Sequence, residues 1–180
     1  MTGPAPDLGS RGTAKDLLWA PHPALSAVAA PVDPTDPGVV AAAADLLATL
    51  RGLPATTGLA APQIGLSRRL IAFDTGRHPR SRSYAGECVL ANPRLVGASH
   101  WDHGREGCAS IAGLTADVLR ATRITVHAHL PGTGEAVTIE ADAFEARCIQ
   151  HQLDHLDGLL FLDRVPGALS LHIELHSCDS

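Results

Sequence analysis

The pattern of hydrophobic and polar positions predicts an amphipathic helix in the first third of the chain. Apolar residues recur there at helical spacing, at Val39, Val40, Ala43, Leu46, Leu47 and Leu50. Asp36 followed by Pro37 is typical of a helix start, because the aspartate caps backbone N–H groups and proline suits the first turn. Gly52 is typical of a helix end. We therefore expect a helix between Asp36 and Gly52 that packs its apolar side on the core.

A second amphipathic helix is predicted between Asp142 and Gly158. Its apolar stripe, at positions i, i+4, i+7 and i+11, consists of Phe144, Cys148, His151 and His155. Asp142, with Glu145 three residues later, predicts a capping box at the helix start. Because both histidines belong to the stripe, we expect them to face the core rather than solvent.

Shorter apolar runs predict strands. Continuous runs indicate buried strands at 70–74 and 88–91, and alternation with polar residues indicates half-buried strands at 124–130 and 137–141. Turn residues at 131–134 join the last two strands into a hairpin. The polar segment 97–106 is expected to be a loop.

The composition is that of a globular protein, since 45% of the 180 residues are hydrophobic and 18% are charged. We expect a single domain over residues 1–165, with residues 1–15 as a flexible arm and residues 166–180 as a short tail. The net charge of −5 argues against binding to nucleic acid, which depends on basic residues that contact phosphates. The sequence shows neither a signal peptide pattern nor a membrane span, which favours a cytoplasmic protein with thiols rather than disulfides. The cysteines are Cys88, Cys108, Cys148 and Cys178.

His151 and His155 are the strongest candidate ligands for a metal ion. Four residues apart in a helix, they lie on one face and can bind the same ion. Burying two imidazoles without a partner is costly, and a metal ion removes that cost. In the H-E-x-x-H pattern the glutamate after the first histidine is a general base, but here that position holds Gln152. A catalytic site needs three protein ligands, and Cys108, preceded by Gly107, is the best third candidate, although buried thiols are common without a metal.

The other histidines are weaker candidates. His127 and His129 lie on the polar side of a predicted strand, so we expect them to be exposed to solvent. His172 and His176 are also four residues apart and lie near Cys178, but they belong to the predicted tail, where a frayed chain end is expected.

Three separated motifs resemble those of the peptide deformylase family and stand in the same order. They are Gly58-Leu59-Ala60-Ala61-Pro62-Gln63, Glu106-Gly107-Cys108-Ala109-Ser110 and His151-Gln152-Leu153-Asp154-His155. The resemblance covers residues 16–165. It implies an α+β fold in which antiparallel sheets pack around a C-terminal metal-binding helix. It also implies a hydrolase for the N-formyl group of a peptide or small molecule, with one divalent ion. Iron(II) is the expected ion, and zinc, nickel and cobalt are substitutes.

The same resemblance implies roles for individual residues. Cys108, His151 and His155 match the metal ligands of the family. Gln63 and the backbone amide of Ala109 match the groups that stabilise the oxyanion formed at the formyl group.

Further matches concern the substrate and the surroundings of the metal. The resemblance implies that Gly58 pairs through its backbone with the substrate, and it makes Leu59, Glu106 and Gly107 substrate-binding positions as well. Glu106, together with Asp154 and Arg120, matches polar residues that orient the metal ligands.

The chain departs from the family pattern at the catalytic glutamate, which is Gln152 here. Glutamine has nearly the same shape and can accept a hydrogen bond, but it cannot take a proton at neutral pH. Loss of a general acid–base group costs on the order of 10²–10⁴ in rate. Four further departures are expected to change the shape of the pocket: Thr56, Ala109, Ala112 and Thr115.

Three interpretations remain open. The chain is a deformylase engineered to trap its substrate, a naturally divergent hydrolase in which Gln152 serves a related reaction, or a catalytically inactive relative that binds metal and ligand. The four further departures favour natural divergence, because a single engineered change would leave those positions standard. We therefore expect a specialised metal-dependent hydrolase with reduced or altered catalysis.

Overall fold

The computed structural model describes residue 8 and the ranges 12–53, 55–76 and 78–173. Within these residues one sheet holds β1 (Gly58–Ala60), β2 (Leu70–Phe73), β3 (Cys88–Cys108), β4 (Ile111–His129) and β5 (Ala136–Asp142), in chain order, and β6 (Leu171–Ile173) pairs with β4. Every neighbouring pair is antiparallel. The α-helices are α1 (Pro37–Arg51) and α2 (Ala143–Leu156), and short 3₁₀ helices cover Pro23–Ser26, Ala61–Ile64, Phe161–Arg164 and Ala168–Ser170. No helix in this part of the chain is long and apolar enough to cross a bilayer.

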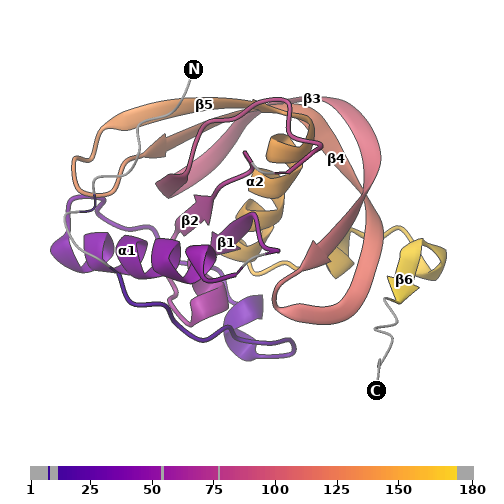
Figure 1. Cartoon of the computed structure of the whole chain (residues 1–180), viewed down its shortest axis with the longest axis horizontal. Coiled ribbons are helices and arrows are strands. Elements are labelled where there is room, and N and C mark those ends of the chain that lie inside the picture. Colours follow the sequence, from indigo (N-terminus) through magenta and orange to yellow (C-terminus); the bar gives the residue numbers. More distant parts are fainter. Residues whose placement is uncertain (1–7, 9–11, 54, 77, 174–180) are drawn as a thin grey trace.

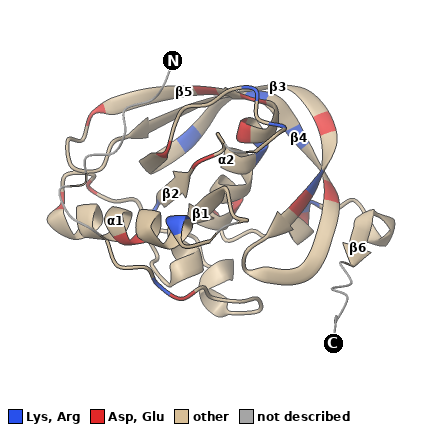
Figure 2. Cartoon of the chain, viewed as in Figure 1, with Lys and Arg blue, Asp and Glu red and all other residues tan. Residues whose placement is uncertain are grey.

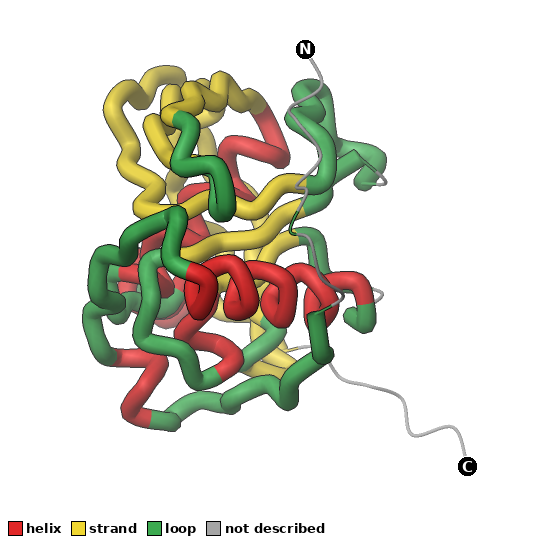
Figure 3. The backbone as a smooth tube through the Cα atoms, turned by 90° about the vertical axis from the view of Figure 1, so that its left-hand side faces the viewer, coloured by secondary structure: helices red, strands yellow, loops and turns green. Residues whose placement is uncertain are grey.

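The predicted α+β architecture around the last helix is confirmed. Figure 1 shows the sheet curving around α2, and every residue from Glu145 to Leu156 is buried. The first helix, α1, lies across the short strands on their other side (Figure 3). Because β2 is covered on both faces, Leu70 packs toward α1 while Ile71 packs toward α2. This double burial explains why the strand is a continuous apolar run.

The long β3–β4 hairpin corrects the prediction of a loop at 97–106. The strand predicted at 88–91 continues, with bulges in its pairing, to Cys108, and its outer half pairs with β4, for example Trp101 with Ala121. The outer half is mostly exposed, so its polar residues carry no alternation between buried and exposed positions. Its strand conformation comes from hydrogen bonds to a distant partner strand, which a local pattern does not reveal.

The predicted start of the first helix is confirmed. Asp36 Oδ1 accepts hydrogen bonds from the backbone N–H groups of Gly38 (2.7 Å) and Val39 (3.1 Å). The helix begins at Pro37 and ends at Arg51, directly before Gly52. The aspartate, the proline and the glycine thus bound the helix as expected.

The predicted capping box of the second helix is wrong. Asp142 precedes α2, but its side chain caps no backbone N–H, because Ala143 has a φ of +47° and turns the chain at the helix start. Glu145 instead accepts hydrogen bonds from Thr75 Oγ1 (3.0 Å) and Ser83 Oγ (2.6 Å). It therefore ties the segment after β2 to the start of α2.

The described part of the predicted N-terminal arm packs on α1. Thr13 N–H donates to Asp45 Oδ1 (2.7 Å), and Lys15 Nζ lies 3.1 Å from Asp45 Oδ2. Residues 1–7 and 9–11 of the predicted arm lie outside the described residues.

The start of the predicted tail belongs to the sheet. Residues 171–173 form β6, and His172 Nε2 lies 2.9 Å from Asp117 Oδ2 on β4. His172 is therefore held against β4, whereas a frayed chain end was expected. His176 and Cys178 lie outside the described residues.

Candidate metal centre and active site

Cys108, His151 and His155 converge at one point. Cys108 ends β3, while the two histidines lie one turn apart on α2. Their sulfur and ring nitrogen atoms lie within 4.8 Å of one another, and Cys108 Sγ is 3.2 Å from His155 Nε2. Among the described residues this is the one group of at least three His, Cys, Asp or Glu side chains with such spacing. Sulfur and imidazole nitrogen are donors that zinc and other first-row divalent ions accept, so these residues fit a single such ion.

Glu106 orients His151. His151 Nδ1 lies 3.0 Å from Glu106 Oε2, so Nε2 is the nitrogen available to a metal. Arg120 donates two hydrogen bonds to the same carboxylate (2.9 and 3.0 Å), and Arg147 donates a third (2.9 Å). Burial by itself raises the pKa of Glu106, but the hydrogen bonds from His151 and Arg120 bring that pKa down to about 2. Glu106 is therefore a carboxylate at neutral pH.

A chain of ion pairs extends from this carboxylate through the molecule. Arg120 Nη1 donates to Asp154 Oδ2 (2.6 Å), and Arg164 Nη2 donates to Asp154 Oδ1 (2.7 Å). Acidic and basic segments are interspersed along β3 and β4 (Figure 2). Glu106 and Asp154 thus share Arg120, and each has a further arginine partner.

The two histidines differ in their affinity for protons. Burial, His151 and Arg120 all lower the pKa of His155, to about 3, so its ring is neutral, which is the form that binds metal. Burial also lowers the pKa of His151, but Cys108 and Glu106 raise it to about 9. A metal ion that binds His151 would therefore displace a proton.

A pocket of about 660 Å³ opens at this cluster, and we call it the front pocket. The predicted site residues that line it are Gly58, Gln63, Glu106, Gly107, Cys108, Ala109, His151 and Gln152. His155 does not line the pocket and is 1% exposed. Leu59 does not line it either, because its side chain is buried in the core cluster under α1.

Gln63 is held with its amide nitrogen toward the metal ligands. Its Oε1 accepts a hydrogen bond from Ala60 N–H (2.9 Å), and its Nε2 donates to Ser110 Oγ (3.1 Å). The same Nε2 lies 3.7 Å from Cys108 Sγ. Ser110 belongs to the second motif but was not predicted as a site residue, although it fixes this amide.

Gln152 carries a buried hydrogen-bond acceptor that has no partner among the described residues. Its side chain is 4% exposed, and its Oε1 is buried without a hydrogen-bond partner among the described residues. The strand β1 approaches this side chain closely, since a Cβ at Gly58 would lie 2.9 Å from Gln152 Nε2 and 2.6 Å from Cys148 Sγ. Only glycine permits this approach.

The four positions at which the resemblance led us to expect further departures from the family pattern gather in one place. Thr56, Ala109, Ala112 and Thr115 all line the front pocket. They come from the segment before β1, from the turn between β3 and β4, and from β4. The departures therefore change the wall of a single pocket rather than scattered surface positions.

Aromatic side chains form one wall of the front pocket, which was not predicted from the sequence. His78 stacks on Phe144 with ring centroids 3.5 Å apart, and the Arg80 guanidinium lies 5.3 Å from the centre of the Phe144 ring. Trp19 lines the same pocket. Phe144 was recognised only as part of an apolar stripe, and the loop that carries His78 and Arg80 has no periodic pattern.

The strand β1 is the first strand of the sheet and lies beside the front pocket. It pairs with β2 on one side, and Gly58 and the preceding Thr57 line the pocket. An extended peptide can add to an exposed strand edge through backbone hydrogen bonds.

The remaining candidate ligands stay apart from the cluster. His127 is exposed, as predicted, whereas His129 is half-buried. Among the described residues, Cys88, Cys108 and Cys148 are free cysteines.

Comparisons with known proteins agree with the three motifs. The family model described as polypeptide deformylase matches residues 14–169. A protein of Symbiobacterium thermophilum named peptide deformylase is 39% identical over 150 residues, which cover 83% of this chain and 65% of that protein. The matched part of the chain thus spans slightly less than two thirds of that relative.

Solved structures are similar over most of the chain. The peptide deformylase of Synechococcus elongatus in complex with actinonin superposes with a TM-score of 0.76 at 31% identity, covering 94% of this chain and 90% of the other. The Acinetobacter baumannii enzyme with Met-Ala-Ser bound has a TM-score of 0.75 at 29% identity, with coverage of 86% and 99%.

Proposed function

Because this chain belongs to the polypeptide deformylase family, we propose that it is a metal-dependent hydrolase that removes the formyl group from an N-formylated compound. The observation that carries the proposal is the convergence of Cys108, His151 and His155 beside the Gln63 amide. A structural metal site would not need an amide donor at its edge or a pocket beside it.

The three ligands would be Cys108, His151 and His155, holding one divalent ion. The family resemblance favours iron(II), and the donor set also suits zinc, cobalt or nickel. When bound, such an ion supplies Lewis acidity, which polarises a carbonyl oxygen and acidifies water. Glu106 would hold His151 in place for this purpose, and Arg120 and Arg147 donate hydrogen bonds to Glu106.

The substrate would lie along β1. Its backbone would pair with Gly58, and its formyl oxygen would accept hydrogen bonds from Gln63 Nε2 and Ala109 N–H. The Met-Ala-Ser bound to the Acinetobacter baumannii relative supports a short peptide as the ligand. The altered wall at Thr56, Ala112 and Thr115 supports a specialised substrate.

Gln152 would limit the rate. Its buried Oε1, which has no hydrogen-bond partner among the described residues, would accept a hydrogen bond from a water that entered the site, but the amide cannot remove the proton or deliver it to the leaving amine. We propose that deformylation is slow for this reason, or that the enzyme favours a substrate with a better leaving group.

A second candidate function is binding without turnover. The unpartnered Gln152 Oε1 in a pocket with metal ligands favours it, because such a site can hold a formamide N–H as readily as water. Tight binding of a formylated peptide without release of formate would establish this alternative.

The test combines metal analysis with a formate-release assay. Purified protein is expected to contain about one divalent ion per chain, and to release formate from formyl-Met-Ala-Ser slowly but catalytically. A protein that holds the ion and neither binds nor hydrolyses any formylated peptide would contradict both candidates.

A further inference from the structure

The wall of the front pocket carries an arginine whose charge no neighbour balances. Arg80 lines the pocket, is exposed, and forms no ion pair among the described residues. The two other described arginines that line it are paired, Arg105 with Asp117 (2.9 Å) and Arg147 with Glu106 (2.9 Å). The pocket therefore keeps a free guanidinium group, although the whole chain carries a net charge of −5.

The acidic side chain in the pocket wall has no capacity left for Arg80. Glu106 accepts two hydrogen bonds from Arg120 and one from Arg147, and its Oε2 lies 3.0 Å from His151 Nδ1. A carboxylate offers about four acceptor positions, so these contacts use all of them. An anion that pairs with Arg80 must therefore come from a ligand.

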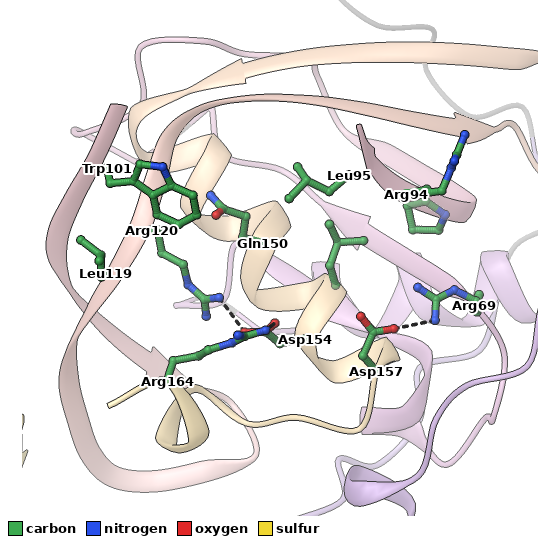
Figure 4. A pocket seen from close by; sticks show the side chains of 12 residues that line it. Arg69, Arg94, Leu95, Trp101, Leu119, Arg120, Gln150, Asp154, Asp157 and Arg164 are labelled. Carbon is green, nitrogen blue, oxygen red and sulfur yellow. Dashed lines mark hydrogen bonds and ion pairs between the residues drawn. The ribbon is translucent and has the colours of Figure 1, made fainter. Parts of the chain in front are cut away.

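Three arginines beside α2 but outside the front pocket are already paired with aspartates. Arg164 donates to Asp154 (2.7 Å), and Arg69 donates to Asp157 (2.8 Å) (Figure 4). Arg120 donates to Asp154 as well (2.6 Å). Pairs of this kind leave little charge for a ligand, which distinguishes these arginines from the one in the front pocket.

The Arg80 guanidinium is held against an aromatic ring. Its central carbon lies 5.3 Å from the centre of the Phe144 ring, which is within the range of a cation–π contact. His78 stacks on the same ring, and its Nδ1 accepts a hydrogen bond from Arg80 N–H (3.2 Å). Burial and the nearby Arg80 lower the pKa of His78, so its ring is neutral at pH 7. Arg80 is therefore the cation of this aromatic wall.

The loop that carries Arg80 is tied to the start of α2. Thr75 Oγ1 and Ser83 Oγ, on either side of Arg80, both donate to Glu145 (3.0 and 2.6 Å). Ser81 Oγ donates to the Ser83 carbonyl (2.8 Å). Because the loop is anchored on both sides, less conformational entropy is lost when a ligand binds Arg80.

The two ends of β1 lie beside different parts of the front pocket. After the strand, Gln63 Nε2 lies 3.7 Å from the candidate metal ligand Cys108. Before the strand, the Thr57 carbonyl lies 3.5 Å from Cys148 Sγ, one helical turn from Phe144. A substrate with its formyl group at the metal ligands and its chain along β1 toward Thr57 would therefore approach Phe144 and the arginine that contacts it.

The length of this path suits a short peptide. Phe144 and His151 are seven residues apart on α2, or about 10.5 Å along the helix axis at about 1.5 Å per residue. An extended peptide spans about 3.3–3.6 Å per residue, so three residues cover about 10–11 Å. A formylated tripeptide would bring its C-terminal carboxylate to the level of Phe144, where Arg80 lies.

From these observations we propose that Arg80 selects substrates that carry a carboxylate. The preferred substrates are short formylated peptides in which a free C-terminus or an acidic side chain meets the guanidinium group. This inference rests on the proposed function and deepens it by naming the class of substrate. Arginine suits the task, because it binds a carboxylate through two parallel hydrogen bonds between charged groups.

The test measures binding of two matched pairs of peptides to the metal-loaded protein by calorimetry. The first pair is formyl-Met-Ala-Ser as the free acid and as the C-terminal amide. The second pair, formyl-Glu-Ala-Ser amide and formyl-Gln-Ala-Ser amide, differs only in a side-chain carboxylate. We expect the anionic member of at least one pair to bind about tenfold more tightly, because it gains a hydrogen bond between charged groups. The pair that shows the preference identifies the carboxylate that is recognised.

Matched variants assign the preference to Arg80. Arg80→Gln should abolish the difference in affinity within the pair. Arg82→Gln removes an exposed arginine of the same loop that does not line the front pocket, and it should retain the difference.

Three results would overturn the inference. They are the absence of any carboxylate preference in both pairs, a preference that survives Arg80→Gln, and equal loss of the preference in Arg80→Gln and Arg82→Gln. Formate release from the same peptides decides the proposed function separately. Turnover without a carboxylate preference would overturn only the role of Arg80, whereas a preference without formate release would support that role and contradict hydrolysis.

Discussion

Replacing Gln152 with glutamate tests the chemistry of the candidate active site most directly. The two side chains have nearly the same shape, so the packing against Gly58 and Cys148 is retained. Burial raises the pKa of the Cys148 thiol to about 12, so that neighbour adds no competing charge. The change therefore introduces a proton acceptor with little other disturbance.

The size of the expected increase in rate depends on how far burial raises the pKa of the new carboxylate. A positioned general base contributes about 10²–10⁴ in rate, or about 2.7–5.4 kcal/mol at 1.36 kcal/mol per decade. Gln152 is 4% exposed, so a carboxylate there would have a raised pKa. A rise of about three units from 4.3 leaves about a third of it ionised at pH 7, which costs about threefold in rate. We expect Gln152→Glu to increase turnover about 30- to 3,000-fold.

The assay measures formate released from formyl-Met-Ala-Ser at matched metal content. The activity of Gln152→Glu should rise with pH through the raised pKa of the new carboxylate. Its stability relative to the unmodified protein should fall as the pH rises from the pKa of glutamate in the unfolded chain, about 4.3, to the raised pKa in the folded state, because the folded state disfavours the charged form. Gln152→Leu, a control of similar size that accepts no hydrogen bond, should not exceed the unmodified protein. Equal activity of Gln152→Glu and the unmodified protein would refute this account of Gln152.

Three further outcomes are expected. Cys108→Ala should remove the bound divalent ion measured by elemental analysis, whereas Cys88→Ala should retain it; retention in both would exclude Cys108 as a ligand. Arg120→Met should lower the free energy of unfolding, measured in urea, by about 3–5 kcal/mol, because it leaves Glu106 and Asp154 without a shared buried partner. The control Arg123→Met, at an exposed position, should change the free energy of unfolding little. Iodoacetamide at pH 8 should leave Cys88 and Cys148 unmodified in the folded protein, because burial raises the pKa of each thiol to about 12; peptide mapping that finds either one alkylated rapidly would contradict this.

Local patterns predicted the elements whose side chains alternate between core and solvent. The helix α1 was found from its periodic apolar residues, α2 from its apolar stripe, and the short buried strands from continuous apolar runs. The outer β3–β4 hairpin was missed because its residues at 97–106 are mostly exposed, so pairing with a distant strand decides the conformation. The capping box failed for a similar reason, because Glu145 has better partners in Thr75 and Ser83 than in its own helix end.

The metal cluster could be predicted because its residue types are rare and their spacing is informative. Cys108, His151 and His155 are recognisable as candidate ligands from the sequence motifs, and they lie together in the structure. The aromatic wall could not be predicted, because His78 and Phe144 meet only through the fold.

The order of the strands has a consequence for how the protein reaches its native state. Because β1 to β5 pair in chain order, the sheet can grow by adding one hairpin after another, each with a modest loop-closure cost. The metal ligands Cys108 and His155 are 47 residues apart in the sequence. They can come together only after α2 has docked on the sheet. We expect capture of the metal ion to be among the last events of folding, and a chain truncated before α2 to lack both histidine ligands.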